Sequence, residues 1–179
     1  MTKKDFLAAI QSRTARVSIG ASAARGRGNK GAVTRARSYL GQLDLTLFAV
    51  RNRTAFKAQL DRATVGLMSA LPRKARRWGL ARKFLNIFLR DCFYTTYLAR
   101  VYHLDRAEKL FELPLDSITA KELRRAAGRG HLPRWLGVRK LNKETSARYQ
   151  AVALEEAKYE KVARVHLDSK YWSANRDMR

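Results

Sequence analysis

The sequence predicts an all-α protein that folds as one domain. Apolar residues recur at helical spacing along most of the 179-residue chain, and the alternation of apolar and polar residues that indicates strands is nearly absent. Apolar residue types make up 46% of the chain, which is enough to fill a sizeable core, and no internal repeat or heptad pattern is visible. We therefore expect residues 1–179 to form a single helical domain.

In the first half of the chain, three helices and one loop are expected. The helices span residues 3–13, 32–43 and 54–71, and the third ends at Pro72 because proline cannot continue a helix. Residues 20–31 contain four glycines and three cations, a composition that predicts a mobile basic loop.

The second half of the chain begins with the expected central helix, residues 80–101, whose first half is apolar on nearly all sides. The segment Leu113-Pro114-Leu115-Asp116 predicts a tight connection, and the glycines at 128 and 130 end the helix that follows it. Apolar spacing predicts the remaining helices over residues 104–112, 117–127, 143–162 and 166–175.

The charge of the chain indicates a polyanionic partner. Lys and Arg number 38 against 15 Asp and Glu, which gives a formal net charge of +23 at pH 7. Nucleic acid would relieve the self-repulsion of so much like charge, and each cation placed on a phosphate releases counterions. A membrane surface favours cations on one face of an amphipathic helix, whereas here they recur along the whole chain.

Several protein classes are excluded by the same sequence. Apolar runs such as residues 47–50 are far too short for a bilayer span, and Asp5 interrupts what would be a signal sequence. The single cysteine, Cys92, excludes an internal disulfide and a cysteine-based zinc site, and the three histidines lack ligand spacing. We expect a cytoplasmic, nucleoid-associated monomer without metal or cofactor.

Two basic groups are candidates for phosphate binding. The first, Arg73, Lys74, Arg76 and Arg77, precedes Gly79 and the start of the central helix, where helix amides and cations together bind phosphate. A solvated charged loop is the alternative interpretation. The second group surrounds a glycine turn and comprises Arg124, Arg125, Arg129, His131 and Arg134. The expected DNA contacts are Arg25, Arg27, Lys30, Arg73, Lys74, Arg76, Arg77, Gly79, Arg82 and Arg129.

Lys83 and Asp116 are the candidate catalytic residues. Lys83 is expected in the first turn of the central helix, where the helix dipole and the nearby Arg77 and Arg82 disfavour its ammonium form. A neutral lysine amine is a nucleophile. Asp116 directly precedes a helix, so its simplest role is an N-cap, and that role alone explains the residue.

A family resemblance connects these two residues. The sequence Trp78-Gly79-Leu80-Ala81-Arg82-Lys83, the apolar helix through Asn86, and Leu113-Pro114-Leu115-Asp116 resemble the core of the helix-hairpin-helix DNA glycosylases, most closely the archaeal 8-oxoguanine branch. The resemblance covers residues 73–127, with a weaker likeness at 135–150 and at Trp172. Of the usual hairpin pattern Leu-Pro-Gly-x-Gly, only Gly79 is present.

The resemblance implies a helix-hairpin-helix element before the central helix and a glycosylase that rotates a damaged or modified base out of DNA. In that family the lysine attacks C1′ of the sugar and the aspartate assists it, with or without strand cleavage. The base would be an oxidised purine or a modified base of phage DNA, enclosed by Trp78, Trp135 and Trp172. Tyr94, Tyr97 and Tyr149 are further pocket candidates, although aromatic residues at helical spacing are more often core.

Two other functions stay open at this point. A non-catalytic DNA- or RNA-binding protein would use the same cations on phosphate, with Asp116 only capping a helix. The chain could also be a partner-binding module of a larger nucleoprotein assembly.

Overall fold

The computed structural model describes residues 1–24 and 31–176, and within these residues the protein is helical and contains no strand. The predicted all-α class is therefore confirmed. The first elements are α1 (Lys3–Ser18), the 3-10 helix η1 (Ala21–Ala24), α2 (Ala32–Gly41), η2 (Leu45–Phe48) and α3 (Arg53–Ala70).

Helix α1 continues to Ser18, beyond the predicted end at residue 13, because its last turns pack against α2. The buried Gln11 side chain joins the two helices, since its Nε2 donates to the backbone oxygens of Leu40 at 3.0 Å and Leu43 at 2.7 Å. Loop residues 25–30 lie outside the described residues, so the prediction of a mobile loop over 20–31 stays a prediction there.

The expected central helix over 80–101 is two helices, α4 (Trp78–Tyr94) and α5 (Thr96–Val101). Thr95 separates them, because its backbone is extended (φ −82°, ψ 98°) and does not continue the helix. The predicted α-helix over 104–112 is instead the 3-10 helix η4 (Leu104–Leu110). A short 3-10 helix, η3 (Arg73–Ala75), lies between α3 and α4.

The C-terminal elements follow the prediction more closely. Helix α6 (Ser117–Ala127) has the predicted bounds, since Asp116 caps its first turn and Gly128 follows its last residue. The remaining elements are η5 (Val138–Lys140), α7 (Lys143–Tyr159), η6 (Arg164–His166) and α8 (Leu167–Arg176).

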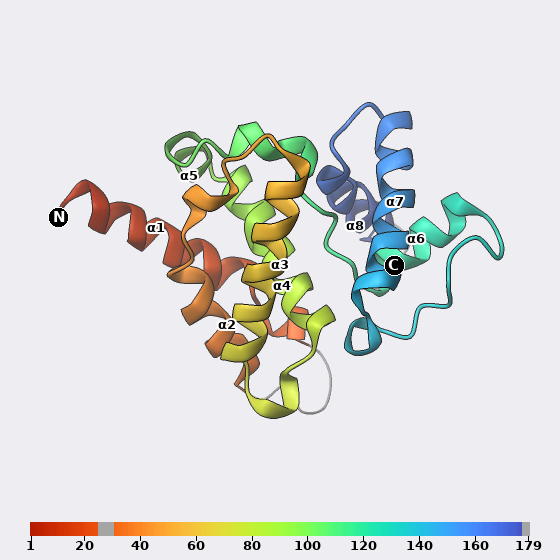
Figure 1. Ribbon diagram of the computed structural model, residues 1–179, viewed down its shortest axis with the longest axis horizontal. Coiled ribbons are helices and arrows are strands. Elements are labelled where there is room, and N and C mark those ends of the chain that lie inside the picture. The colour runs from red at the N-terminus through yellow and green to blue at the C-terminus, as the bar shows by residue number, and fades with distance from the viewer. Residues whose placement is uncertain (25–30, 177–179) are drawn as a thin grey trace.

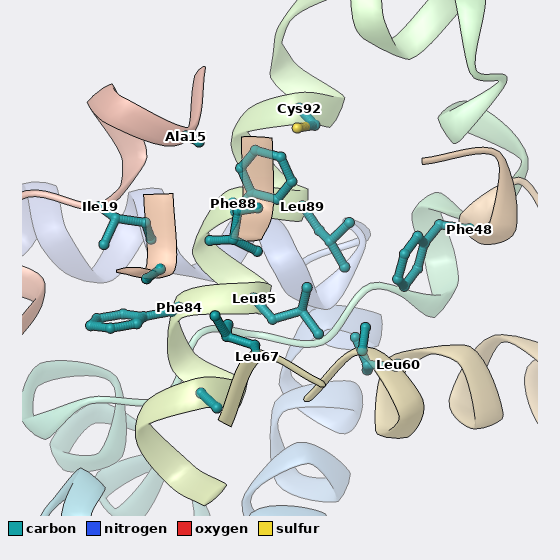
Figure 2. Close-up of a cluster of buried hydrophobic side chains, with 14 of the residues drawn as sticks. Ala15, Ile19, Phe48, Leu60, Leu67, Phe84, Leu85, Phe88, Leu89 and Cys92 are labelled. Atoms are coloured by element: carbon teal, nitrogen blue, oxygen red, sulfur yellow. The ribbon is translucent and has the colours of Figure 1, made fainter. Parts of the chain in front are cut away.

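Two clusters of buried apolar residues hold the described part of the chain together. The first surrounds α4, whose Phe84, Leu85, Phe88 and Leu89 point into it from different sides, as expected for a central helix (Figure 2). The second cluster lies among α6, α7 and α8, which stand on one side of α4 while α1 and α2 stand on the other (Figure 1). The segment that joins the clusters, residues 111–116, leads directly into α6.

Candidate active site

A cleft of about 760 Å³ lies along α4. One wall is α4 itself, and the others come from the end of α1, η1, the start of α6, the segment over residues 135–139 and the first turns of α8. The cleft therefore forms where elements of the two apolar clusters meet.

Lys83 and Asp116 both line this cleft, and Nζ of Lys83 lies 3.6 Å from Oδ2 of Asp116. Their side chains are mostly buried, with exposed fractions of 11% and 12%. The structure thus brings together two residues that are 33 positions apart in the sequence (116 − 83 = 33). Lys83 lies in the second turn of α4 rather than the first, because the helix begins at Trp78.

The two carboxylate oxygens of Asp116 have different neighbours. Oδ1 accepts the backbone N–H groups of Ile118 at 2.9 Å and Thr119 at 3.1 Å, and Thr119 Oγ1 in turn accepts the Asp116 N–H at 2.8 Å. This capping box fixes the side chain at the start of α6. Because Oδ2 faces Lys83, the residue caps a helix with one oxygen and meets the amine with the other.

The expected DNA contact at Arg82 is wrong. Its side chain is only 2% exposed and forms ion pairs with Asp61 and with Glu112, whose Oε2 lies 3.5 Å from Nε. The guanidinium carbon also lies 4.8 Å from the centre of the Trp78 ring. Arg82 therefore holds the interior together, and the two carboxylates weaken its expected repulsion of the Lys83 ammonium.

Two of the three expected pocket tryptophans line the cleft. Trp135 packs edge-on against Tyr149 with a centroid distance of 5.5 Å, and Trp172 on α8 is partly exposed. Trp78 was expected there too, but it packs under Arg82 and beside the second apolar cluster. Tyr94 also lines the cleft, and its hydroxyl lies 2.8 Å from Nδ1 of His166.

The structure adds charged cleft residues that the sequence analysis missed, among them Arg90, Asp91 and Asp168. Arg90 Nε donates to Asp91 Oδ1 at 2.8 Å, and Nη1 of the same guanidinium pairs with Oδ2 of Asp168. All three residues line the cleft, where they offer hydrogen-bond donors and acceptors together. Arg90 and Asp91 interrupt an apolar stretch of α4, a signal visible in the sequence, whereas the placement of Asp168 depends on how α8 packs.

Gly79 was expected to contact DNA, but it is buried and has a packing role. It is the second residue of α4 and is buried, and a Cβ there would lie 2.2 Å from the backbone oxygen of Val138. The absence of a side chain therefore lets η5 pack against the start of α4.

The basic group before α4 is exposed as the sequence predicts. Arg73, Lys74, Arg76 and Arg77 all face solvent along the connection from α3, and no side chain caps the first turn of α4. Four exposed cations that could bind phosphate thus lie directly before this helix start.

The other predicted contacts are not brought to the same place. Arg129 is exposed on the turn after α6, at the right edge of Figure 1, while the connection from α3 to α4 lies at the bottom. Arg125 of the second basic group pairs with Glu122 at 2.7 Å. Arg25, Arg27 and Lys30 lie outside the described residues.

Comparison of the chain with protein-family models, with curated proteins and with solved structures finds no match. Among residues 1–24 and 31–176, the longest apolar stretch of any helix falls short of what a membrane crossing requires. The same described residues contain no group of three or more His, Cys, Asp or Glu side chains that could hold a metal ion. Cys92 is buried, and burial raises the pKa of its thiol well above the ordinary value.

Proposed function

We propose that the protein is a lysine-dependent DNA glycosylase that removes a damaged or modified base. The observation that supports this most is the juxtaposition of the Lys83 amine and the Asp116 carboxylate, 3.6 Å apart in a cleft that two tryptophans also line. In this proposal α3, the connection over residues 71–77 and α4 act as the helix-hairpin-helix element that grips the DNA backbone. We propose that one copy of the chain is the active form, because the residues of the cleft come from one chain.

The proposed reaction begins with loss of a proton from the Lys83 ammonium, because only the neutral amine has an electron pair to donate. The nitrogen bonds to C1′ of the sugar as the bond from C1′ to the base breaks. The electron pair of that bond leaves with the base, which takes up a proton. Opening of the sugar ring at O4′ then gives an imine, from which loss of a C2′ proton would expel the 3′ phosphate and cut the strand.

Asp116 has two tasks in this scheme. Its Oδ2 orients the amine and receives the proton of the ammonium, which it passes on to the leaving base. The negative charge restored in this way offsets the positive charge that develops on the sugar. The backbone N–H groups on Oδ1 keep the carboxylate in place while the reaction proceeds. Such a fixed charge costs no reorganisation when the transition state forms.

The rest of the cleft suits a base that has been rotated out of the helix. Trp135 and Trp172 offer apolar surfaces for stacking, and Arg90 with Asp168 offers hydrogen-bonding groups for the edge of a base. The exposed cations before α4 would hold the phosphates of the same DNA, which implies a location at the nucleoid. Oxidised purines and modified bases of phage DNA are both substrates of this chemistry.

Borohydride trapping tests the proposal, because borohydride reduces the imine and leaves a covalent adduct between protein and DNA. Oligonucleotides that carry single oxidised, deaminated, alkylated or phage-type modified bases are incubated with the wild type, Lys83→Ala and Lys74→Ala. We expect an adduct on at least one substrate with the wild type and with Lys74→Ala, and none with Lys83→Ala. Lys74 is the matched control because it is an exposed lysine near the same helix start.

The rival function is a non-catalytic binder of DNA or RNA. It is favoured by the fact that Asp116 is a complete helix cap and that Lys83 and Asp116 form an ordinary ion pair. DNA binding that persists in both variants, without base release or adduct on any substrate, would support the rival and contradict the enzyme.

A further inference from the structure

Leu136 is a large apolar side chain that faces solvent at the cleft. It is 66% exposed, and it lines the same cleft as Lys83 and Asp116. A single exposed leucine on a protein surface is ordinary, so exposure alone gives it no role. Leu136 differs from other exposed apolar residues in two ways: the backbone on either side of it is packed against the interior, and cations lie near it in the sequence.

The backbone on either side of Leu136 is fixed to the interior. On the N-terminal side, Trp135 packs on Tyr149, whose hydroxyl donates to the backbone oxygen of Pro133 at 2.8 Å. On the C-terminal side, η5 packs on Gly79 so closely that no Cβ would fit between them. Leu136 is therefore presented to solvent by a segment that is packed on the same helix as Lys83.

Exposed cations flank this leucine along the chain. Arg134 lies two residues before it, Arg139 and Lys140 follow within four residues, and all three are exposed. Arg139 also lines the cleft. An apolar tip between cations matches the chemistry of a DNA helix, in which stacked bases lie between two phosphate backbones.

We propose that Leu136 is a wedge residue that enters double-stranded DNA where the target nucleotide has rotated into the cleft. This inference rests on the proposed glycosylase function and names its substrate as duplex DNA. Rotation of a nucleotide leaves a gap between the neighbouring base pairs, and an apolar side chain that fills the gap replaces part of the lost stacking. A single strand has no such gap, so Leu136 contributes only on a duplex.

Binding to DNA with a permanent gap tests the wedge without knowledge of the base. The probes are a duplex that carries one tetrahydrofuran abasic analogue opposite cytosine and an unmodified duplex of the same sequence. The Kd of each probe is measured for the wild type, Leu136→Ala, Leu136→Met and Leu47→Ala. Leu47 is the control because it is an exposed leucine that does not line the cleft.

We expect the wild type to bind the gapped duplex more tightly than the unmodified one. Leu136→Ala should lose about tenfold of that preference, which corresponds to about 1.4 kcal/mol, with little change in affinity for the unmodified duplex. Leu136→Met should retain the preference because methionine also fills the gap, and Leu47→Ala should match the wild type.

Two results would overturn the wedge: no preference of the wild type for the gapped duplex, or a preference that Leu136→Ala keeps. Borohydride trapping with the same protein preparations reports on the chemistry separately. An adduct that forms while the gap preference does not depend on Leu136 overturns only the wedge. A gap preference that depends on Leu136 without any adduct supports the wedge and contradicts the proposed glycosylase reaction.

Discussion

Nε of Arg82 lies 3.5 Å from Oε2 of Glu112, so the residue next to Lys83 is paired with the segment that leads to Asp116. Both side chains are buried, and Asn86 Nδ2 also approaches Oε2 of Glu112 at 3.4 Å. The pair of Arg82 and Glu112 joins α4 to residues 111–116, the segment between the two apolar clusters. The geometry of the candidate catalytic pair therefore depends on a buried ion pair beside it.

Loss of the Glu112 charge should destabilise the fold. We expect Glu112→Gln to lower the free energy of unfolding by about 3 kcal/mol, because it leaves part of the buried Arg82 charge without a partner. The matched control is Glu155→Gln, since Glu155 is 69% exposed and its pair with Lys158 should contribute less than about 0.5 kcal/mol. Urea unfolding measures both values, and equal losses would contradict this role of Glu112.

Asp61 should make the stability of the protein depend on acid pH. Partial burial raises the pKa of its carboxyl, but Lys57 and Arg82 lower it by more, so the pKa lies below the ordinary value of 3.8. A carboxyl whose pKa is lower in the folded state stabilises the fold above the unfolded value and loses that contribution as the pH falls through the folded value. We expect the advantage of the wild type over Asp61→Asn in urea unfolding to shrink below about pH 4. Parallel curves for the two proteins down to pH 2 would contradict this pairing.

Local signals explain why most helices could be predicted from the sequence. The bounds of α6 follow from the cap at Asp116 and from Gly128, which are both visible in the chain. The break at Thr95 was not predictable in this way, because the apolar pattern continues across it. The apolar spacing likewise predicts a helix at η4 but does not indicate that it is a 3-10 helix.

The candidate site was predicted less completely than the helices. Lys83 and Asp116 were expected together because of a resemblance over a short stretch, and the structure brings them within 3.6 Å. The burial of Arg82 depends on Asp61 and Glu112, which come from distant parts of the chain. No local pattern reveals such partners, so a basic residue in a basic stretch was interpreted as a phosphate contact.

The exposed cations before α4 should determine how DNA affinity varies with salt. Replacement of Arg73, Lys74, Arg76 and Arg77 by alanine should lower the slope of log Kd against log salt concentration by about 0.9 for each phosphate contact that is lost. The control replaces Lys3 and Lys4, which are exposed on α1 near the N-terminus, at the left of Figure 1. We expect a smaller change for this control in fluorescence anisotropy titrations. An affinity that does not vary with salt would contradict phosphate binding altogether.

Replacement of Asp116 separates its capping role from its proposed catalytic role. Asparagine caps helices about as well as aspartate, so Asp116→Asn keeps the cap and loses only the charge that faces Lys83, whereas Asp116→Ala loses both. Asp116→Ala should therefore lower the free energy of unfolding by about 1 kcal/mol more than Asp116→Asn does. Only the carboxylate can receive a proton from Lys83 and offset positive charge on the sugar, so Asp116→Asn should slow adduct formation by about a hundredfold or more. Urea unfolding and timed borohydride trapping give the two numbers on the same protein samples. If Asp116→Asn forms the adduct at the rate of the wild type, then the oxygen that faces Lys83 takes no part in the chemistry and Asp116 only begins α6.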